Sequence, residues 1–160
     1  MPLVAALLKH EGFARAMDAL EKKEETRFFC RHGLDHALDV ARIMTILSLE
    51  NERDFARETI YLAALLHDIG RSANDAHHDE ASVALARDFL HAIGADEAQS
   101  ADILEAISNH RDKSKTVTAA SASLSELLAM ADTLSRPCYR CKAAAECYWS
   151  DARRNHIITY

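Results

Sequence analysis

Histidine and aspartate side chains that could bind a metal ion stand out at the end of one apolar segment. In Tyr61–Arg71 (YLAALLHDIGR), a run that would otherwise be core ends in His67 and Asp68. Adjacent residues of a helix diverge by about 100°, so these two side chains can reach around one point in front of them. Imidazole and carboxylate groups are ligands that transition metals accept. The pair is therefore a candidate for metal chemistry.

Three other segments carry similar groups among apolar residues at helical spacing. His36 shares a face with the apolar residues that follow it, His110 with those that precede it, and Asp132 follows an apolar residue by one turn. A single inward histidine is more often a hydrogen-bonded core residue than a ligand, whereas a buried aspartate must be paired or protonated. Several such groups on separate helices favour a divalent cation, because it gives every one of them a partner.

The order and intervals of these residues resemble the H…HD…D signature of the HD-domain superfamily, which consists of helical, metal-dependent phosphohydrolases. The resemblance rests on the sequences HALDVA at 36–41, HDIG at 67–70 and MADTLS at 130–135, and it spans about residues 31–136. It implies that four residues bind one metal ion: His36, His67, Asp68 and Asp132.

Some members of that superfamily bind a second ion through additional histidines. His78 and His110 look like those ligands, and Asp68 would then bridge the two ions. The adjacent His77 competes with His78, and His32 could reach the edge of the site. Mixed imidazole and carboxylate ligation favours manganese, iron, cobalt, nickel or zinc over magnesium and calcium, without choosing among these metals or between one ion and two.

The resemblance implies hydrolysis of a phosphate ester by a metal-activated water. Arg71 follows the HDIG motif where related two-metal proteins often have lysine, and its planar guanidinium can bind two phosphate oxygens. Asp68 and Arg71 are therefore the expected catalytic residues. Arg111 and Arg136 are further candidates for phosphate contact. Other cations near these motifs are expected to be ordinary solvated residues: Lys113 and Lys115.

The expected substrate is a small phosphorylated compound such as a nucleotide or a related metabolite. Related proteins that cleave cyclic dinucleotides carry a Gly-Tyr-Pro element, which this chain lacks. Three alternatives remain. The site could hold a metal and a phosphorylated ligand in a signalling module without turnover, it could be a di-iron oxygenase on the same scaffold, or the polar groups could form a buried network without metal.

The end of the chain carries a second pattern that is typical of metal sites. Cys138 and Cys141 are separated by two residues, and Cys147 could add a third thiolate. Cys30 or His156 could complete a set of four for a structural zinc or cluster. The alternative is reduced thiols, some buried as small apolar residues, and a lone C-x-x-C motif favours this alternative.

Composition excludes several classes of protein. Of the 160 residues, 49% are apolar and 28% charged, so the chain is neither disordered nor a membrane protein. The net charge of -6 predicts no general attraction to nucleic-acid polymers or anionic lipid. No apolar run suits a signal sequence or a membrane span, so we expect a cytoplasmic protein. The oligomeric state is open, with a homodimer as one option.

Helical periodicity throughout predicts one all-α domain over residues 1–160, a compact bundle of about six to seven helices. We expect an HD-type core over about 31–136, followed by a cysteine-containing segment at 137–160. Expected caps are Asp54, Asp96 and the capping box of Ser123 with Glu126, and Gly70 is an expected stop. The predicted helices cover about Leu3–Lys23, Leu34–Glu50, Asp54–Ile69, 79–93, 96–110, 123–135 and Ala143–Arg153.

Overall fold

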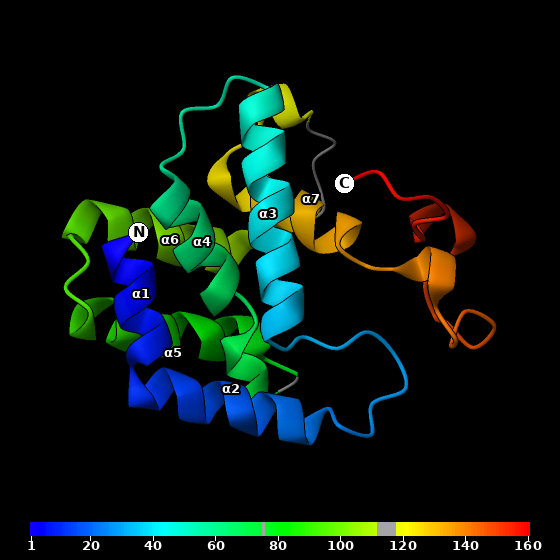
Figure 1. Cartoon of the computed structure of the whole chain (residues 1–160), viewed down its shortest axis with the longest axis horizontal. Coiled ribbons are helices and arrows are strands. Elements are labelled where there is room, and N and C mark those ends of the chain that lie inside the picture. Colours follow the sequence, from blue (N-terminus) through cyan, green and yellow to red (C-terminus); the bar gives the residue numbers. More distant parts are fainter. Residues whose placement is uncertain (75, 112–117) are drawn as a thin grey trace.

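The computed structural model describes residues 1–74, 76–111 and 118–160, and all regular structure within them is helical (Figure 1). The all-α prediction is confirmed. The α-helices are α1 (Pro2–Lys9), α2 (Glu11–Lys23), α3 (Leu34–Glu50), α4 (Arg57–Leu66), α5 (His78–Ala92), α6 (Glu97–Asn109) and α7 (Leu124–Leu134). Four short 3-10 helices are η1 (Ile69–Ser72), η2 (Ala119–Ser121), η3 (Cys138–Arg140) and η4 (Asp151–Arg153).

Helix α4 runs through the interior of the bundle and is buried on nearly all sides. Leu62, Leu65 and Leu66 pack into a cluster with residues of α1, α2, α5 and α6. Ile60 and Ala64 pack into a second cluster with residues of α3 and α7. A helix that is apolar all round belongs in the interior. The run before His67 and Asp68 is apolar for this reason, and its end delivers them to the middle of the molecule.

Gly70 allows the chain after α4 to lie directly against the start of α5. A Cβ atom at this position would be 2.3 Å from the carbonyl oxygen of His78 and 2.3 Å from the amide nitrogen of Ser82. The backbone N–H of Gly70 also donates to Oγ of Ser82 at 2.9 Å. The glycine was expected to stop a helix at Ile69, but α4 ends at Leu66 and Gly70 lies inside η1. It is required by close packing rather than by helix termination.

Two of the expected caps set the starts of helices that carry site residues. Asp96 accepts from the backbone N–H of Gln99 at 2.8 Å and begins α6. Ser123 and Glu126 form the expected capping box at the start of α7. The expected cap at Asp54 is wrong, because α4 begins three residues later and Ala56 precedes it without a side-chain cap.

The predicted helix over Leu3–Lys23 is divided in two at His10. This residue has extended backbone angles, and its Nδ1 atom accepts from the backbone N–H of Phe13, so it ends α1 and caps α2. Each half has apolar residues at helical spacing, so the periodicity predicted helix on both sides of His10 without locating the break. The break turns α1 and α2 into separate helices that pack on the same core cluster.

The segment after α7 contains no α-helix, so the helix predicted over Ala143–Arg153 is wrong. It holds η3 and η4, and Ala143 is its buried apolar residue. Polar contacts attach it to α7. Nδ2 of Asn155 lies within hydrogen-bonding distance of the carbonyl oxygens of Thr133, Leu134 and Arg136. Figure 1 shows this segment beside the bundle, on the side to which the α2–α3 loop also extends. In the described residues, no helix is long and apolar enough to cross a membrane.

Candidate metal centre

Five helical elements bring the six predicted metal ligands together. His36 comes from α3, the His67–Asp68 pair follows α4, His78 begins α5, His110 follows α6 and Asp132 lies on α7. Among the described residues, two groups have ligand atoms within 4.8 Å of one another. The first consists of His36, His67 and Asp132, and the second of Asp68, His78 and His110.

Asp68, a member of the second group, also faces the first group. Its Oδ2 atom is 3.3 Å from Nε2 of His67 and 3.9 Å from Nε2 of His36, while its Oδ1 atom is 3.2 Å from Nε2 of His78. Nε2 of His36 is also 3.5 Å from Oδ1 of Asp132. One carboxylate therefore faces both groups, which is the position that a bridging ligand needs. Bridging itself stays a prediction.

His67 and His110 are oriented in the same way, each at the end of its helix. Nδ1 of His67 lies 2.7 Å from the carbonyl oxygen of Ala64. Nδ1 of His110 lies 2.6 Å from the carbonyl oxygen of Ile107. A ring nitrogen beside a carbonyl oxygen donates its proton to it, so in the neutral ring Nε2 is the atom left to accept a metal. Both rings therefore present Nε2 to the site.

Two buried nitrogen atoms of the first group have no hydrogen-bond partner in the described structure: Nε2 of His36 and Nε2 of His67. The Asp68 carboxylate is 3.3 Å from the latter nitrogen and can pair with it only when the ring carries a second proton. A buried polar atom without a partner costs free energy, and buried polar groups are usually satisfied. A cation bound in this group would give both nitrogens a partner. The donor set therefore fits a metal ion.

The protonation states follow from burial and from neighbouring charges. Burial, reinforced by the charge of His67, lowers the pKa of His36 and that of His110 to about 4 each. Burial would lower the pKa of His67 as well, but the negative charge of Asp68 raises it to about 9. Burial would raise the pKa of Asp68, but His67 holds it well below its ordinary value. Without a cation, His67 is thus an imidazolium at neutral pH, whereas His36 and His110 are neutral.

Arg71 is in direct contact with two residues of the second group. Its Nε atom donates to Oδ1 of Asp68 at 2.9 Å, and its Nη2 atom lies 3.1 Å from Nε2 of His78. The guanidinium therefore contacts two predicted ligands of the second ion, and its role in binding phosphate stays a prediction. His77, the alternative to His78, is exposed and belongs to neither group.

A buried glutamate, which the sequence analysis missed, holds His32 beside the site. Oε1 of Glu24 lies 2.7 Å from Nδ1 of His32, and Oε2 accepts from the backbone N–H of the same residue at 2.6 Å. Nε2 of His32 is then 4.0 Å from Oδ2 of Asp68. Burial would raise the pKa of Glu24, but hydrogen bonds from His32 lower it. Glu24 directly follows the charged end of α2 and has no sequence pattern that would have marked it as buried.

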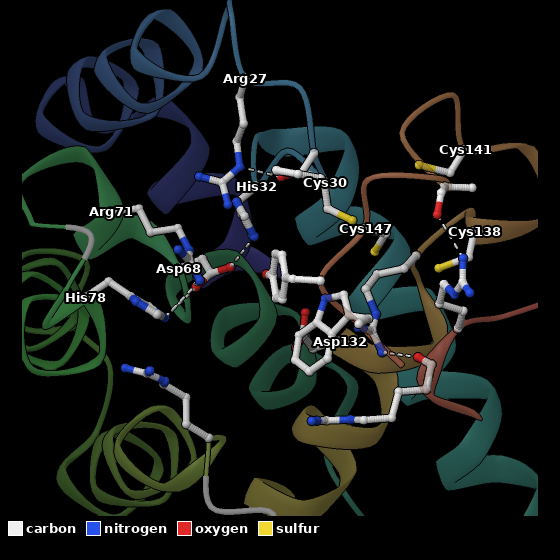
Figure 2. A pocket seen from close by; sticks show the side chains of 18 of the residues that line it. Arg27, Cys30, His32, Asp68, Arg71, His78, Asp132, Cys138, Cys141 and Cys147 are labelled. Carbon is white, nitrogen blue, oxygen red and sulfur yellow. Dashed lines mark hydrogen bonds and ion pairs between the residues drawn. The ribbon is translucent and has the colours of Figure 1, made fainter. Parts of the chain in front are cut away.

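A cavity of about 520 Å³ opens on the second group (Figure 2). Four of the predicted metal ligands line it: Asp68, His78, His110 and Asp132. Six arginines also line it: Arg27, Arg71, Arg111, Arg136, Arg153 and Arg154. Both further arginines predicted to bind phosphate are therefore at the cavity, whereas Lys113 and Lys115 lie outside the described residues.

The two predicted phosphate contacts differ in what already holds them. Nη1 of Arg111 pairs with Oδ1 of Asp79 at 3.1 Å on a partly exposed surface. Arg136 is buried, donates to the carbonyl oxygens of Thr133 and Arg153, and lies over the ring of Trp149 at 4.8 Å from its centroid. Arg136 therefore fastens the C-terminal segment to α7, which the sequence analysis did not anticipate.

The four cysteines predicted as a second metal site are free thiols, and each is half-buried. All four line the same cavity as the HD residues. None belongs to a group of three or more ligand atoms within 4.8 Å among the described residues. His156, the alternative fourth ligand, lies beside Asp151 instead, with Nε2 3.0 Å from its carbonyl oxygen.

Comparison with known proteins identifies a family for most of this chain. A sequence profile of the HD domain family matches residues 33–136. A protein of Clostridium beijerinckii, described as an uncharacterized protein, is 39% identical over 143 residues, which cover 88% of this chain and 87% of that protein. No solved structure matches the chain significantly. The matched range of the profile contains all six predicted ligands, whereas the four cysteines lie outside it.

Proposed function

Because this chain belongs to the HD domain family, we propose that it is a metal-dependent phosphohydrolase that cleaves a phosphate ester of a small soluble substrate. The observation that carries the proposal is the pair of buried Nε2 atoms, on His36 and His67, without hydrogen-bond partners in the described structure. They face two carboxylates and belong to the set of residues that the family signature requires. A network without metal would leave Nε2 of His36 unsatisfied, and it would hold His67 only as an imidazolium beside Asp68.

His36, His67, Asp68 and Asp132 would hold one divalent transition metal ion. His78 and His110 would hold a second ion together with Asp68. Such ions, when bound, neutralise phosphate charge and lower the pKa of a water molecule. Manganese, iron, cobalt, nickel and zinc all suit this mixture of nitrogen and oxygen donors.

Residues of the cavity wall would bind and orient the phosphate of the substrate. The lining contains six guanidinium groups, against the two carboxylates of Asp68 and Asp132, so the wall favours an anionic ligand. Arg71 uses two of its five N–H donors on Asp68 and His78, which leaves others for a phosphoryl oxygen. It would orient the phosphate directly beside the metal ligands.

The size and rim of the cavity support a nucleotide or a compound of similar size. Ligand cavities commonly have volumes of about 300–1,000 Å³, and this one has about 520 Å³. Tyr148 lies at its edge with 68% of its surface exposed, so its ring is accessible for stacking on a base. The excess of arginines favours a phosphorylated substrate over an uncharged diol, and so favours hydrolysis over the di-iron oxygenase alternative.

The test measures phosphate release from nucleoside mono-, di- and triphosphates by protein loaded separately with each of the five metals. Asp68→Ala is expected to abolish release, with circular dichroism to verify the fold. Asp39→Ala is the matched control, because it removes an exposed carboxylate of α3 that pairs with Arg42. Saturable binding of a nucleotide without release under any metal would overturn hydrolysis and favour the signalling module. Oxygen uptake with a diol would favour the oxygenase.

A further inference from the structure

Two regions far apart in the sequence bring cysteines to one wall of the cavity. Cys30 lies in the α2–α3 loop, whereas Cys138, Cys141 and Cys147 lie in the segment after α7. We propose that these four thiols bind a thiophilic metal centre, either a zinc ion or an iron–sulfur cluster, that fastens the C-terminal segment to the α2–α3 loop. This centre is distinct from the HD site and does not depend on the proposed function.

Aromatic contacts place the two regions side by side. The rings of Phe29 and Tyr148 pack edge to face, with centroids 5.7 Å apart. These residues are the sequence neighbours of Cys30 and Cys147, so the contact brings the two cysteine backbones together. Figure 2 draws the four sulfur atoms on one side of the cavity, across from Asp68 and His78, and all four cysteines line that cavity.

Local hydrogen bonds hold the backbone of both cysteine-bearing regions. The N–H of Cys141 donates to the carbonyl oxygen of Cys138 at 3.1 Å, which closes η3 between the two cysteines. Nε of Arg27 donates to the carbonyl oxygen of Cys30 at 2.8 Å and fixes the loop on the other side. A C-x-x-C turn facing further cysteines from elsewhere in the chain is the usual plan of a four-thiolate site.

The C-terminal segment contains few buried apolar residues. Ala143 is its buried apolar residue, while Ile157 and Ile158 are 72% and 69% exposed. A segment that cannot build a core of its own is commonly fixed by a metal or by disulfides. Polar contacts of Arg136 and Asn155 attach the stretch around Arg153 and Asn155 to the end of α7. A thiolate centre would add a direct bond between the earlier part of the segment and the α2–α3 loop.

The thiols of the C-terminal segment also act on the electrostatic environment of Cys30. Burial raises the pKa of its thiol, the neighbouring Cys138 and Cys141 raise it further, and the charge of Arg136 opposes them. These interactions show that Cys138 and Cys141 lie close enough to Cys30 for their thiols to interact electrostatically. A bound metal would deprotonate them and convert the same proximity into ligation.

A zinc ion and an iron–sulfur cluster require different distances between the four sulfur atoms. A zinc ion with Zn–S bonds of about 2.3 Å holds its ligands about 3.8 Å apart. No thiol belongs to a group of three or more ligand atoms within 4.8 Å in the described residues, so the sulfurs would move inward on binding zinc. An iron–sulfur cluster also takes four cysteines and is wider, so it requires less movement.

The deciding experiment compares metal content in full-length protein that is purified anaerobically. Zinc, iron and acid-labile sulfide per chain are measured in the wild type, in Asp68→Ala and in the double variant Cys138→Ser/Cys141→Ser. We expect either one zinc or iron with matching sulfide, retained in Asp68→Ala and absent from the double variant. Zinc identifies a single-ion site, and sulfide identifies a cluster.

A second measurement on the wild type covers the case in which the double variant does not fold. After the native metal is replaced by cobalt, four-thiolate ligation gives intense thiolate-to-cobalt charge-transfer absorption, which the HD ligands cannot produce. Three results would overturn the proposal: loss of all metal in Asp68→Ala, a disulfide among the four cysteines in anaerobic protein, or rapid reaction of all four thiols with a thiol reagent in untreated protein.

Discussion

Oδ1 of Asp68 lies 3.2 Å from Nε2 of His78, although the two residues belong to different helical elements. The contact exists because the backbone of η1 lies against the first turn of α5 at Gly70, where no side chain intervenes. The distance between the two predicted ligand groups is therefore set by backbone packing. A residue with no functional group of its own thus controls the geometry of the site.

Substitution Gly70→Ala is expected to separate η1 from α5. Its Cβ atom would meet backbone atoms of His78 and Ser82 at 2.3 Å, and these cannot rotate away. Overpacking of this kind costs about 1–3 kcal/mol, and sometimes more. We expect this loss in urea unfolding, together with loss of the second metal ion.

The matched control for this substitution is Gly33→Ala, whose Cβ would meet only the flexible side chain of Glu21. It should cost about 1 kcal/mol or less, because the Glu21 side chain can move away and only the poorer N-cap preference of alanine opposes the change. Equal destabilisation by the two variants would contradict the role assigned to Gly70.

Metal binding is expected to release a proton from His67. The charge of Asp68 raises the pKa of this ring to about 9, so at neutral pH a metal must displace its proton. His36 and His110, with pKa values near 4, are already neutral and compete little. Affinity for the first ion should therefore rise about tenfold per pH unit between pH 7 and 9, and level off above that range.

Calorimetry of the metal-free protein in buffers of different ionisation enthalpy measures this proton release directly. We expect about one proton per first ion at pH 7.5 and fewer above pH 9. Release that does not change between these pH values would show that His67 is neutral before the metal binds.

Glu24→Gln is expected to lower activity while the metal content stays unchanged. The carboxylate accepts from both the ring and the backbone of His32, and the amide would lose its charge and one acceptor. Loss of a hydrogen bond that orients a residue beside the metal ligands typically lowers activity or metal affinity by 10–100-fold. The variant should therefore lose about tenfold or more in kcat/KM on the best substrate found.

Glu25→Gln serves as its control, because this neighbouring side chain is exposed and its backbone oxygen, not its carboxylate, contacts Arg31. Its activity should match that of the wild type. If Glu24→Gln lost metal in proportion to activity, Glu24 would act on the ligands themselves rather than on His32.

Arg136→Ala is expected to loosen the C-terminal segment. Arg136 lies over the ring of Trp149 and donates to the carbonyl oxygen of Arg153, so its removal deletes a stacked and hydrogen-bonded anchor. Trp149 is the one tryptophan of the chain, and its fluorescence reports on this segment alone. We expect red-shifted emission and faster proteolysis after α7.

Arg136→Lys should not restore the wild-type behaviour, because an ammonium lacks the planar fork that stacks and donates in two directions. Arg140→Ala, at an exposed position in η3, is the control and should leave the emission unchanged. Wild-type emission in Arg136→Ala would mean that other contacts hold the segment.

The sequence alone indicated the ligand types, their order and most of the helices that carry them. Helix α3 runs over Leu34–Glu50 as its periodicity predicted, and the caps at Asp96 and Ser123 begin α6 and α7. These features depend on residues within one or two turns of each other, so a local pattern is enough to reveal them. The family signature extended this reach, because it relates positions such as His36 and Asp132 that lie on different helices.

Tertiary structure decided what depends on contact between elements. It divided the first helix at His10, replaced the predicted C-terminal helix with short turns, and assigned Gly70 to backbone packing. It also buried Glu24 under His32 and brought Cys30 to the cavity that the three later cysteines line. None of these relationships has a period or a spacing along the chain. They arise when separate elements pack together, and only the folded arrangement determines which residues then meet.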